Sequence, residues 1–233
     1  LNPSEKMLRA AVVFSAVLGA AWALVAPRGG LEARRWALGA GAWGEVSRSS
    51  VVEAGCAVTA PRKEFSHFLR KATVFIIEHD ERGSLGVNLL KPTLLTIGEA
   101  AQGVVTGDLA ENTLYAGGES GGRGAVMLHA VADLDGAVRV GDSPIFVGGI
   151  RAATARVDDG DRDPTDFKFF FNYVRWGPGD LDDAVAEGRW CAFTVPPSVV
   201  LAQDDDADPA DLWNYLHRRP VDDDDAFDDD ADD

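Results

Sequence analysis

The strongest constraint on how this chain folds is a strand, a turn and a helix that follow one another between residues 167 and 187. Residues 167–174 (FKFFFNYV) are too aromatic for a surface helix and predict a buried strand. Two glycines and a proline in residues 176–181 (WGPGDL) then force a turn. Asp180 is expected to cap a helix over residues 181–187, because its side-chain oxygen can accept from the first N–H groups of that helix.

Short strands dominate the rest of the chain. Residues 72–78 and 84–90 are rich in β-branched and apolar side chains and predict a hairpin across a turn at residues 80–83. Further strands are predicted at residues 113–116, 125–129, 137–140, 145–147 and 190–195. Because helices are interspersed irregularly among these strands, neither a βαβ repeat nor a plain sandwich fits, and an α+β fold is expected.

Two further helices are indicated by local signals. Thr96 is suited to cap a short helix through Ala101. Residues 209–218 predict a closing helix whose inward face comprises Leu212, Trp213 and Leu216. Residues 151–157 are too short and mixed for the pattern to assign them.

The first 50 residues predict a leader. An uncharged run of 17 residues (10–26) follows Arg9 and ends at Pro27, which is the order of a secretory signal, with Ala21 and Ala23 marking a cleavage site. The run is at the short limit for crossing a bilayer, so a membrane anchor and a buried helix remain alternatives.

Residues 27–50 are basic and poor in acids, as in organelle transit peptides. A signal followed by such a segment resembles the two-part leader of plastid proteins in algae with secondary plastids. We therefore expect a plastid or another membrane-bounded compartment, with secretion or membrane anchoring as the alternative. Membrane contact is expected only through this segment, if it is uncleaved.

The C-terminus predicts a disordered acidic tail. Its last 13 residues, 221–233, carry nine Asp and no basic residue, and such a segment buries too little apolar surface to fold. The chain is thus expected to divide into a leader (1–50), an α+β domain (51–219) and a tail (220–233).

Charge and cysteine content exclude some functions. The net charge of −16 repels phosphate backbones, and the densest basic cluster beyond the leader is Lys63, Arg70 and Lys71, so direct nucleic-acid binding is not expected. Cys56 and Cys191 are too few for a disulfide scaffold and are not spaced as metal ligands. They either pack as small apolar residues or bridge each other.

Several segments form one ordered set between about residue 55 and residue 216. They are VFIIEHD (74–80), Gly83, Gly86, KPT (91–93), YAGG (115–118), Leu128 with His129, and YVRWGPGDL (173–181). In their order and spacing they resemble the AlgH/YqgE family. The resemblance implies a mixed or antiparallel, bifurcated sheet that is curled into a pseudo-barrel with flanking helices. It implies little about chemistry, although the family is often labelled a transcriptional regulator.

The chain departs from the family pattern at three positions. Leu90 stands where the family usually has Asn, Glu119 where it has Pro, and Asp180 where it has Gln. If those polar groups line a pocket in relatives, the pocket of this protein is altered.

The candidates for chemistry are few. A small-molecule hydrolase or metal-dependent enzyme would use His79, His129 and Glu78, but their spacing matches no metal motif. The structural alternative is that His129 is a hydrogen-bonded core histidine and that His79 orders the hairpin turn. Ser120 lies between glycines but lacks the strand-to-helix turn of a nucleophile elbow, and no cofactor motif is present in the sequence.

We therefore expect a non-enzymatic binding or regulatory protein with a protein or small-molecule partner, and no catalytic, cofactor or metal site. Glycine-rich turns let a partner approach the backbone, which places the expected surface where such turns meet strand ends. The candidate binding residues are Glu78, His79, Tyr115, Gly117, Gly118, His129, Trp176, Gly177, Gly179 and Asp180.

Overall fold

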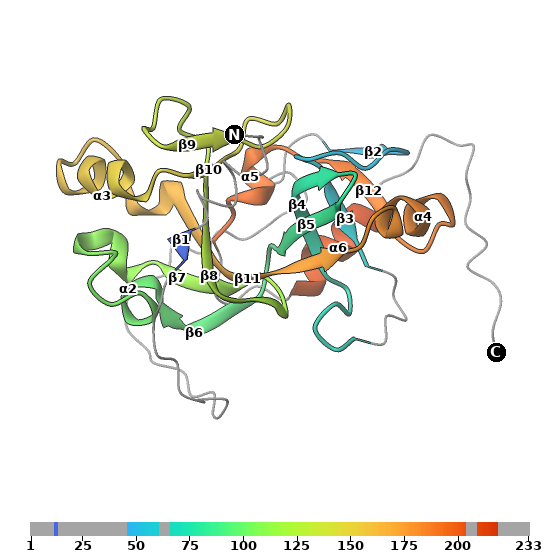
Figure 1. Cartoon of the computed structure of the whole chain (residues 1–233), viewed down its shortest axis with the longest axis horizontal. Helices are drawn as coiled ribbons and strands as arrows, with labels where there is room; N and C mark the ends of the chain where they lie inside the picture. The colour runs from blue at the N-terminus through green and yellow to red at the C-terminus, as the bar shows by residue number, and fades with distance from the viewer. Residues whose placement is uncertain (1–11, 14–45, 61–65, 204–208, 219–233) are drawn as a thin grey trace.

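A computed structural model describes residues 12–13, 46–60, 66–203 and 209–218 (Figure 1). The predicted signal run and its cleavage site, apart from residues 12–13, and the predicted acidic tail lie outside these residues. Short helices surround one large sheet, so the expected α+β class is confirmed. Among the described residues, none of the helices combines the length and the apolar character needed to cross a bilayer.

The sheet contains twelve strands, most of them antiparallel to their neighbours. They are β1 (Val12–Val13), β2 (Ser47–Ser49), β3 (Ala57–Thr59), β4 (Thr73–Asp80), β5 (Gly83–Asn88), β6 (Pro92–Thr96), β7 (Thr113–Ala116), β8 (Ser120–His129), β9 (Ala137–Arg139), β10 (Phe146–Gly148), β11 (Phe167–Trp176) and β12 (Cys191–Thr194). The main path runs β2-β12-β3-β4-β5-β11-β8-β10-β9. Its ends are not joined, so closure into a pseudo-barrel stays a prediction.

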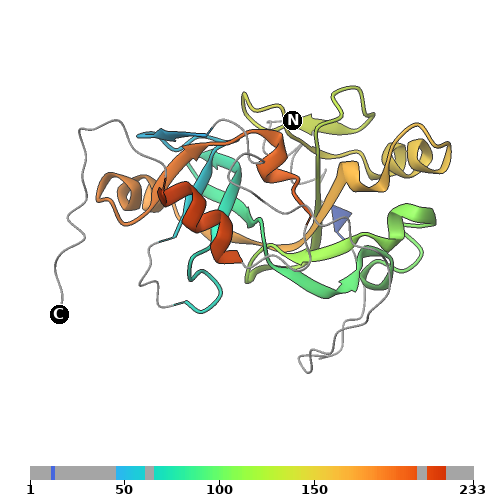
Figure 2. The same cartoon turned by 180° about the vertical axis from the view of Figure 1, so that it is seen from behind.

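Helices flank this sheet (Figure 1 and Figure 2). The α-helices are α2 (Ile97–Ala100), α3 (Ile150–Asp158), α4 (Asp180–Ala186), α5 (Pro197–Val200) and α6 (Pro209–Arg218), and two 3-10 helices are η1 (Gly107–Glu111) and η2 (Pro164–Asp166). The predicted capping by Thr96 is confirmed, because its hydroxyl accepts from the N–H of Glu99 at 3.2 Å while the Glu99 carboxylate accepts from the N–H of Thr96 at 2.9 Å.

Strand β11 is where the sheet divides. Along one edge it pairs antiparallel with β8 from Phe167 onwards. Along the other edge its first half pairs parallel with β7, and its last residues, 174–176, pair antiparallel with β5. Gly117 bridges the fork, since it accepts from the N–H of Asn88 at 2.8 Å and donates to the carbonyl of Phe171 at 2.8 Å. A bulge at Asn172, whose φ is +62°, accommodates the change of partner.

Strand β11 contributes a positively charged side chain to the protein core, which the sequence analysis did not predict. Lys168 is fully buried, and its ammonium donates to the carbonyl of Leu89 at 2.8 Å and to that of Ala202. It also lies 4.4 Å from the ring centroid of Tyr115. Carbonyl oxygens and an aromatic face stabilise the charge in the absence of bulk water, so the lysine links β11 to the segments that follow β5 and α5.

Several local predictions need correction. The helix at the Trp-Gly-Pro-Gly turn begins one residue earlier than predicted, and its N-cap is Gly179, with φ +76°, instead of Asp180. The Asp180 carboxylate accepts from the N–H of Gly177 at 3.0 Å, so it closes the turn from inside the helix. Several elements were not predicted: the strands β1, β2, β3 and β6, the helix α5, and the 3-10 helices η1 and η2. Residues 150–158, which the pattern left unassigned, form the helix α3.

Candidate functional site

Two of the segments that the sequence singled out lie side by side. In the sheet register His79 is opposite Ser84, and Ser84 is opposite Trp176, so the end of β4 reaches the end of β11 across one strand. The approach at the hairpin turn is close: a Cβ on Gly83, whose φ is +117°, would lie 2.2 Å from the carbonyl oxygen of Trp176. The Glu-His strand end and the Trp-Gly-Pro-Gly bend are therefore neighbours in the fold.

His79 joins the hairpin to helix α4. Its Nδ1 lies 2.8 Å from the hydroxyl of Ser84, and its Nε2 lies 3.4 Å from a carboxylate oxygen of Asp182. Serine, histidine and aspartate in this order resemble a catalytic triad, but Ser84 is only 3% exposed and sits inside a paired strand. A substrate carbonyl would not reach it, so His79 orders the hairpin and orients α4. Sequence reasoning missed Asp182, because its contact spans about a hundred residues.

Glu78 lies beside this contact and is half-buried. Loss of solvent raises the pKa of its carboxyl, and the nearby charge of Asp80 raises it further, while Arg82 and Arg175 oppose the shift. Protonation of Glu78 is thus easier than that of an exposed glutamate.

A hollow of about 340 Å³ opens at the Trp-Gly-Pro-Gly bend. Its lining comes from the end of β11, from α4 and from the turn before β12, namely Trp176, Asp180, Asp183, Ala184, Glu187, Arg189 and Trp190. The rings of Trp176 and Trp190 meet edge to face, with centroids 5.4 Å apart. We call the hollow that these seven residues line the bend hollow.

The bend hollow is acidic. Three carboxylates line it, those of Asp180, Asp183 and Glu187, against the single guanidinium of Arg189. The Arg189 Nε lies 2.6 Å from a carboxylate oxygen of Glu187, so much of its charge is matched already. The carboxylates in the first turn of α4 are stabilised by the positive end of the helix dipole. Next to two indole rings, such a lining suits a cationic group.

The other predicted site residues lie elsewhere. Tyr115 is fully buried in the core, and Gly117 and Gly118 are packed against β11. A Cβ on Gly118 would lie 1.8 Å from the carbonyl carbon of Tyr173, so this glycine permits a chain crossing and presents little surface to a ligand. Gly177 and Gly179, by contrast, belong to the bend itself.

His129 is also apart from the bend. It is fully buried, with centroid distances of 5.9 Å to Phe146 and 5.6 Å to Phe167. The N–H of Val131 donates to Nδ1 at 3.2 Å, so Nε2 carries the proton and donates to the carbonyl of Gly148 at 3.2 Å. Burial lowers the pKa of His129 to about 4, although the hydrogen bond to the carbonyl of Gly148 opposes the shift. The structural interpretation of His129 fits this geometry, and an open pocket shared with His79 does not.

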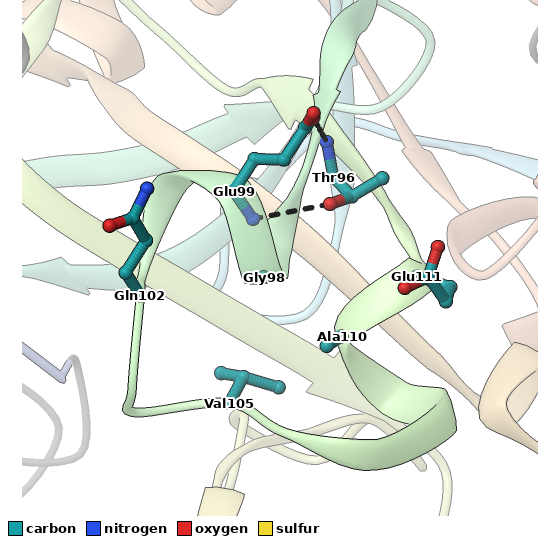
Figure 3. Close-up of a pocket in the computed structure, with 7 residues that line it drawn as sticks. All are labelled: Thr96, Gly98, Glu99, Gln102, Val105, Ala110 and Glu111. Carbon is teal, nitrogen blue, oxygen red and sulfur yellow. Dashed lines mark hydrogen bonds between the residues drawn. The ribbon is translucent and has the colours of Figure 1, made fainter.

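A second hollow, of about 420 Å³, lies beside α2 (Figure 3). Its lining is Thr96, Gly98, Glu99, Gln102, Val105, Ala110 and Glu111. Figure 3 shows the Glu99 carboxylate turned back to the backbone of Thr96, where it completes the helix cap. The bend hollow differs from this one in having two indole rings beside its carboxylates.

The described part of the chain contains no cluster of side chains that could bind a metal ion. Within residues 12–13, 46–60, 66–203 and 209–218, no three His, Cys, Asp or Glu side chains are grouped as a metal ion requires. Both cysteines are free thiols, with Cys56 buried and Cys191 half-buried, so the alternative of a bridge between them is not realised.

Comparison with known proteins agrees with the fold. A family model described as AlgH-like matches residues 57–221. A protein of Streptomyces avermitilis is 30% identical over 158 residues, covering 64% of this chain and 77% of its own length. One of Mycolicibacterium gilvum is 25% identical over 180 residues, covering 73% and 83%. Both bear the name "UPF0301 protein", which states no activity.

Two solved structures resemble the chain. The crystal structure of a protein of Corynebacterium diphtheriae has a TM-score of 0.60 at 21% identity and covers 75% of this chain and 91% of that one. The solution structure of the AlgH protein of Pseudomonas aeruginosa has a TM-score of 0.51 at 14% identity, covering 63% and 79%. At these identities the likeness concerns the fold alone.

Proposed function

Because the chain belongs to the AlgH-like family, whose relatives bear names without an activity, we propose that it is a non-enzymatic binding protein that acts through the bend hollow. The ligand is a basic side chain on a protein partner, an arginine or a lysine. One observation carries this proposal: two indole rings and three carboxylates line a hollow at the point where β11 turns into α4.

The chemistry of the lining favours a cation over other ligands. Indole rings attract cations through the negative face of the ring, and carboxylates add charge-assisted hydrogen bonds. An anionic ligand such as a phosphate would meet three negative charges and one guanidinium that is already bound to Glu187. The net charge of −16 would also speed the approach of a basic partner.

The backbone and side chains around the bend hollow are held in place by packing and hydrogen bonds. A ligand can therefore bind without a large rearrangement of the protein. Leu181 of α4 is fully buried, and burying a leucine side chain stabilises a fold by roughly 2 kcal/mol. The N–H of Trp190 donates to the carbonyl of Ala184 at 3.0 Å and closes the turn after α4. The contact between the His79 Nε2 and a carboxylate oxygen of Asp182, at 3.4 Å, holds the helix to the hairpin. A ligand therefore meets a preformed surface.

The proposal is tested by NMR titration of the full chain with the acetylated, amidated peptide Gly-Arg-Gly-Arg-Gly. We expect saturable shifts in the indole N–H signals of Trp176 and Trp190 and in the backbone signals of α4. The same peptide with glutamine in place of arginine should leave these signals unmoved, because it lacks the charge. Equal shifts with both peptides, or shifts that avoid the bend hollow, would contradict the proposal.

Charge-matched variants separate the bend hollow from the general acidity of the protein. The double variant Asp183→Asn with Glu187→Gln removes two carboxylates from the lining, and we expect its affinity for the arginine peptide to fall about tenfold, as for lost charge-assisted contacts. Asp135→Asn with Asp159→Asn removes two exposed carboxylates elsewhere and should change the affinity far less. Similar losses in both variants would mean that only the net charge matters.

A further inference from the structure

Strand β8 has one edge that the rest of the sheet leaves largely open. Its inner edge pairs with β11. On the outer edge, among the described residues, β10 meets β8 at Leu128 and His129, which are the last two of its ten residues. Bare N–H and C=O groups along a strand edge are a template for another strand.

A separate piece of the chain occupies part of this outer edge. Val12 and Val13, which form β1, pair antiparallel with Ala125 and Gly124. Ala125 is paired with Phe171 of β11 at the same time, so β1 must lie on the opposite edge of β8, in line with β10. Figure 1 and Figure 2 both show β1 beside the middle of β8.

The sequence of β8 makes this edge easy to approach. Its first half, residues 120–124 (SGGRG), contains three glycines. At Gly124 a Cβ would meet no atom of the described residues within 4 Å, so the face of the strand is open at this position. The partner segment has the complementary character, because Val12 and Val13 are consecutive β-branched residues with high strand propensity.

We propose that the outer edge of β8 at Gly124 and Ala125 is a strand-addition site, and that its occupant is the N-terminal segment around Val12 and Val13. Main-chain hydrogen bonds to β8 provide the affinity for the added strand. Its apolar, β-branched side chains provide the sequence specificity. A pairing of two residues is short, so the segment is displaceable and is held mainly by its attachment to the same chain. Removing the N-terminus then opens the edge to an extended apolar segment of the same kind.

Amide hydrogen exchange of the full chain, read by NMR, tests the site. In the double variant Val12→Pro with Val13→Pro the segment has no N–H groups to donate. We expect at least one of the amides of Gly124 and Ala125 to exchange about tenfold faster than in the wild type. The matched variant Val12→Ile with Val13→Ile keeps the N–H groups and the β-branching, and it should exchange like the wild type.

A peptide supplied in trans completes the test. The segment of residues 8–17 (LRAAVVFSAV) should restore slow exchange at Gly124 and Ala125 in the double-proline variant, and the same peptide with proline at both valines should not. Unchanged exchange at Leu128 and Phe170 in the double-proline variant shows that its core is intact. Wild-type exchange at Gly124 and Ala125 in that variant overturns the proposal. Protection that rises with protein concentration also overturns it, because the occupant is then a second copy.

Discussion

At the scale of single residues, His129 shows how burial decides the role of a titratable side chain. The same imidazole could be a base or a metal ligand on an open surface. Here both ring nitrogens are used by backbone groups, and Phe146 and Phe167 pack against the ring. The side chain therefore stabilises the end of β8 in its neutral form.

This neutral state makes the stability of the fold depend on pH. The pKa of His129 is about 4 in the folded chain and near 6.5 when unfolded, so the unfolded state binds the proton more readily between these values. As the pH falls from 7 to about 4, we expect this residue to lower the free energy of unfolding by about 3 kcal/mol. Urea denaturation measures the effect, and His129→Gln should show a shallower loss on acidification. Equal losses in the two proteins would show that His129 is not buried in its neutral form.

At the scale of elements, the division of the sheet at β11 depends on how closely the Gly117-Gly118 turn packs against the β11 backbone. Gly118 lies where the turn crosses the backbone of Tyr173. The gap between the two backbones at this point is too small for a methyl group on Gly118. The turn carries the chain from β7 to β8, which flank β11 on opposite edges. A side chain at this crossing would push the two edges apart.

A pair of glycine variants tests this role. Gly118→Ala should cost at least about 3 kcal/mol of unfolding free energy or prevent folding, because backbone atoms must move to admit the methyl group. Gly124→Ala lies within β8, where no atom of the described residues would be within 4 Å of the new Cβ, and it should change stability by less than about 1 kcal/mol. Thermal or urea unfolding gives both values. A small effect at Gly118 would mean that the crossing is looser than the structure shows.

Predictions of elements succeeded where the signal was local. The hairpin of β4 and β5, the cap at Thr96 and the aromatic strand β11 follow from runs of side chains and from turn residues. The extension of β8 back to Ser120 was missed, because glycines predict a loop and only pairing with β11 and β1 makes them extended. The strand β6 was missed for the same reason, since Pro92 argues against a strand unless it lies at an edge.

At the scale of the whole molecule, charge dominates what the surface can bind. The net charge is −16, and nine of the acidic residues lie in residues 221–233. Long-range repulsion of this size opposes contact with a phosphate backbone and favours basic partners. The label of transcriptional regulator therefore does not require contact with DNA.

A fluorescence-anisotropy titration of a short DNA duplex tests the nucleic-acid prediction. At about 50 mM NaCl, where electrostatic binding is strong, we expect no saturation below about 10 μM protein. A chain without residues 220–233 serves as the control, because it lacks the nine tail carboxylates yet should still fail to bind. Saturable binding by the full chain would refute the prediction, and binding by the truncated chain alone would mean that the tail masks a basic surface.

The sequence by itself determined the α+β class, the hairpin, the Trp-Gly-Pro-Gly turn and the acidic character, because propensity, turn chemistry and charge are properties of neighbouring residues. Only the tertiary structure decided which of the predicted site residues lie together. It joined His79 to Asp182 and Trp176 to Trp190, and it buried Tyr115 and His129. These relations depend on contacts between residues far apart in the chain, and no local pattern encodes how closely two distant backbones pass.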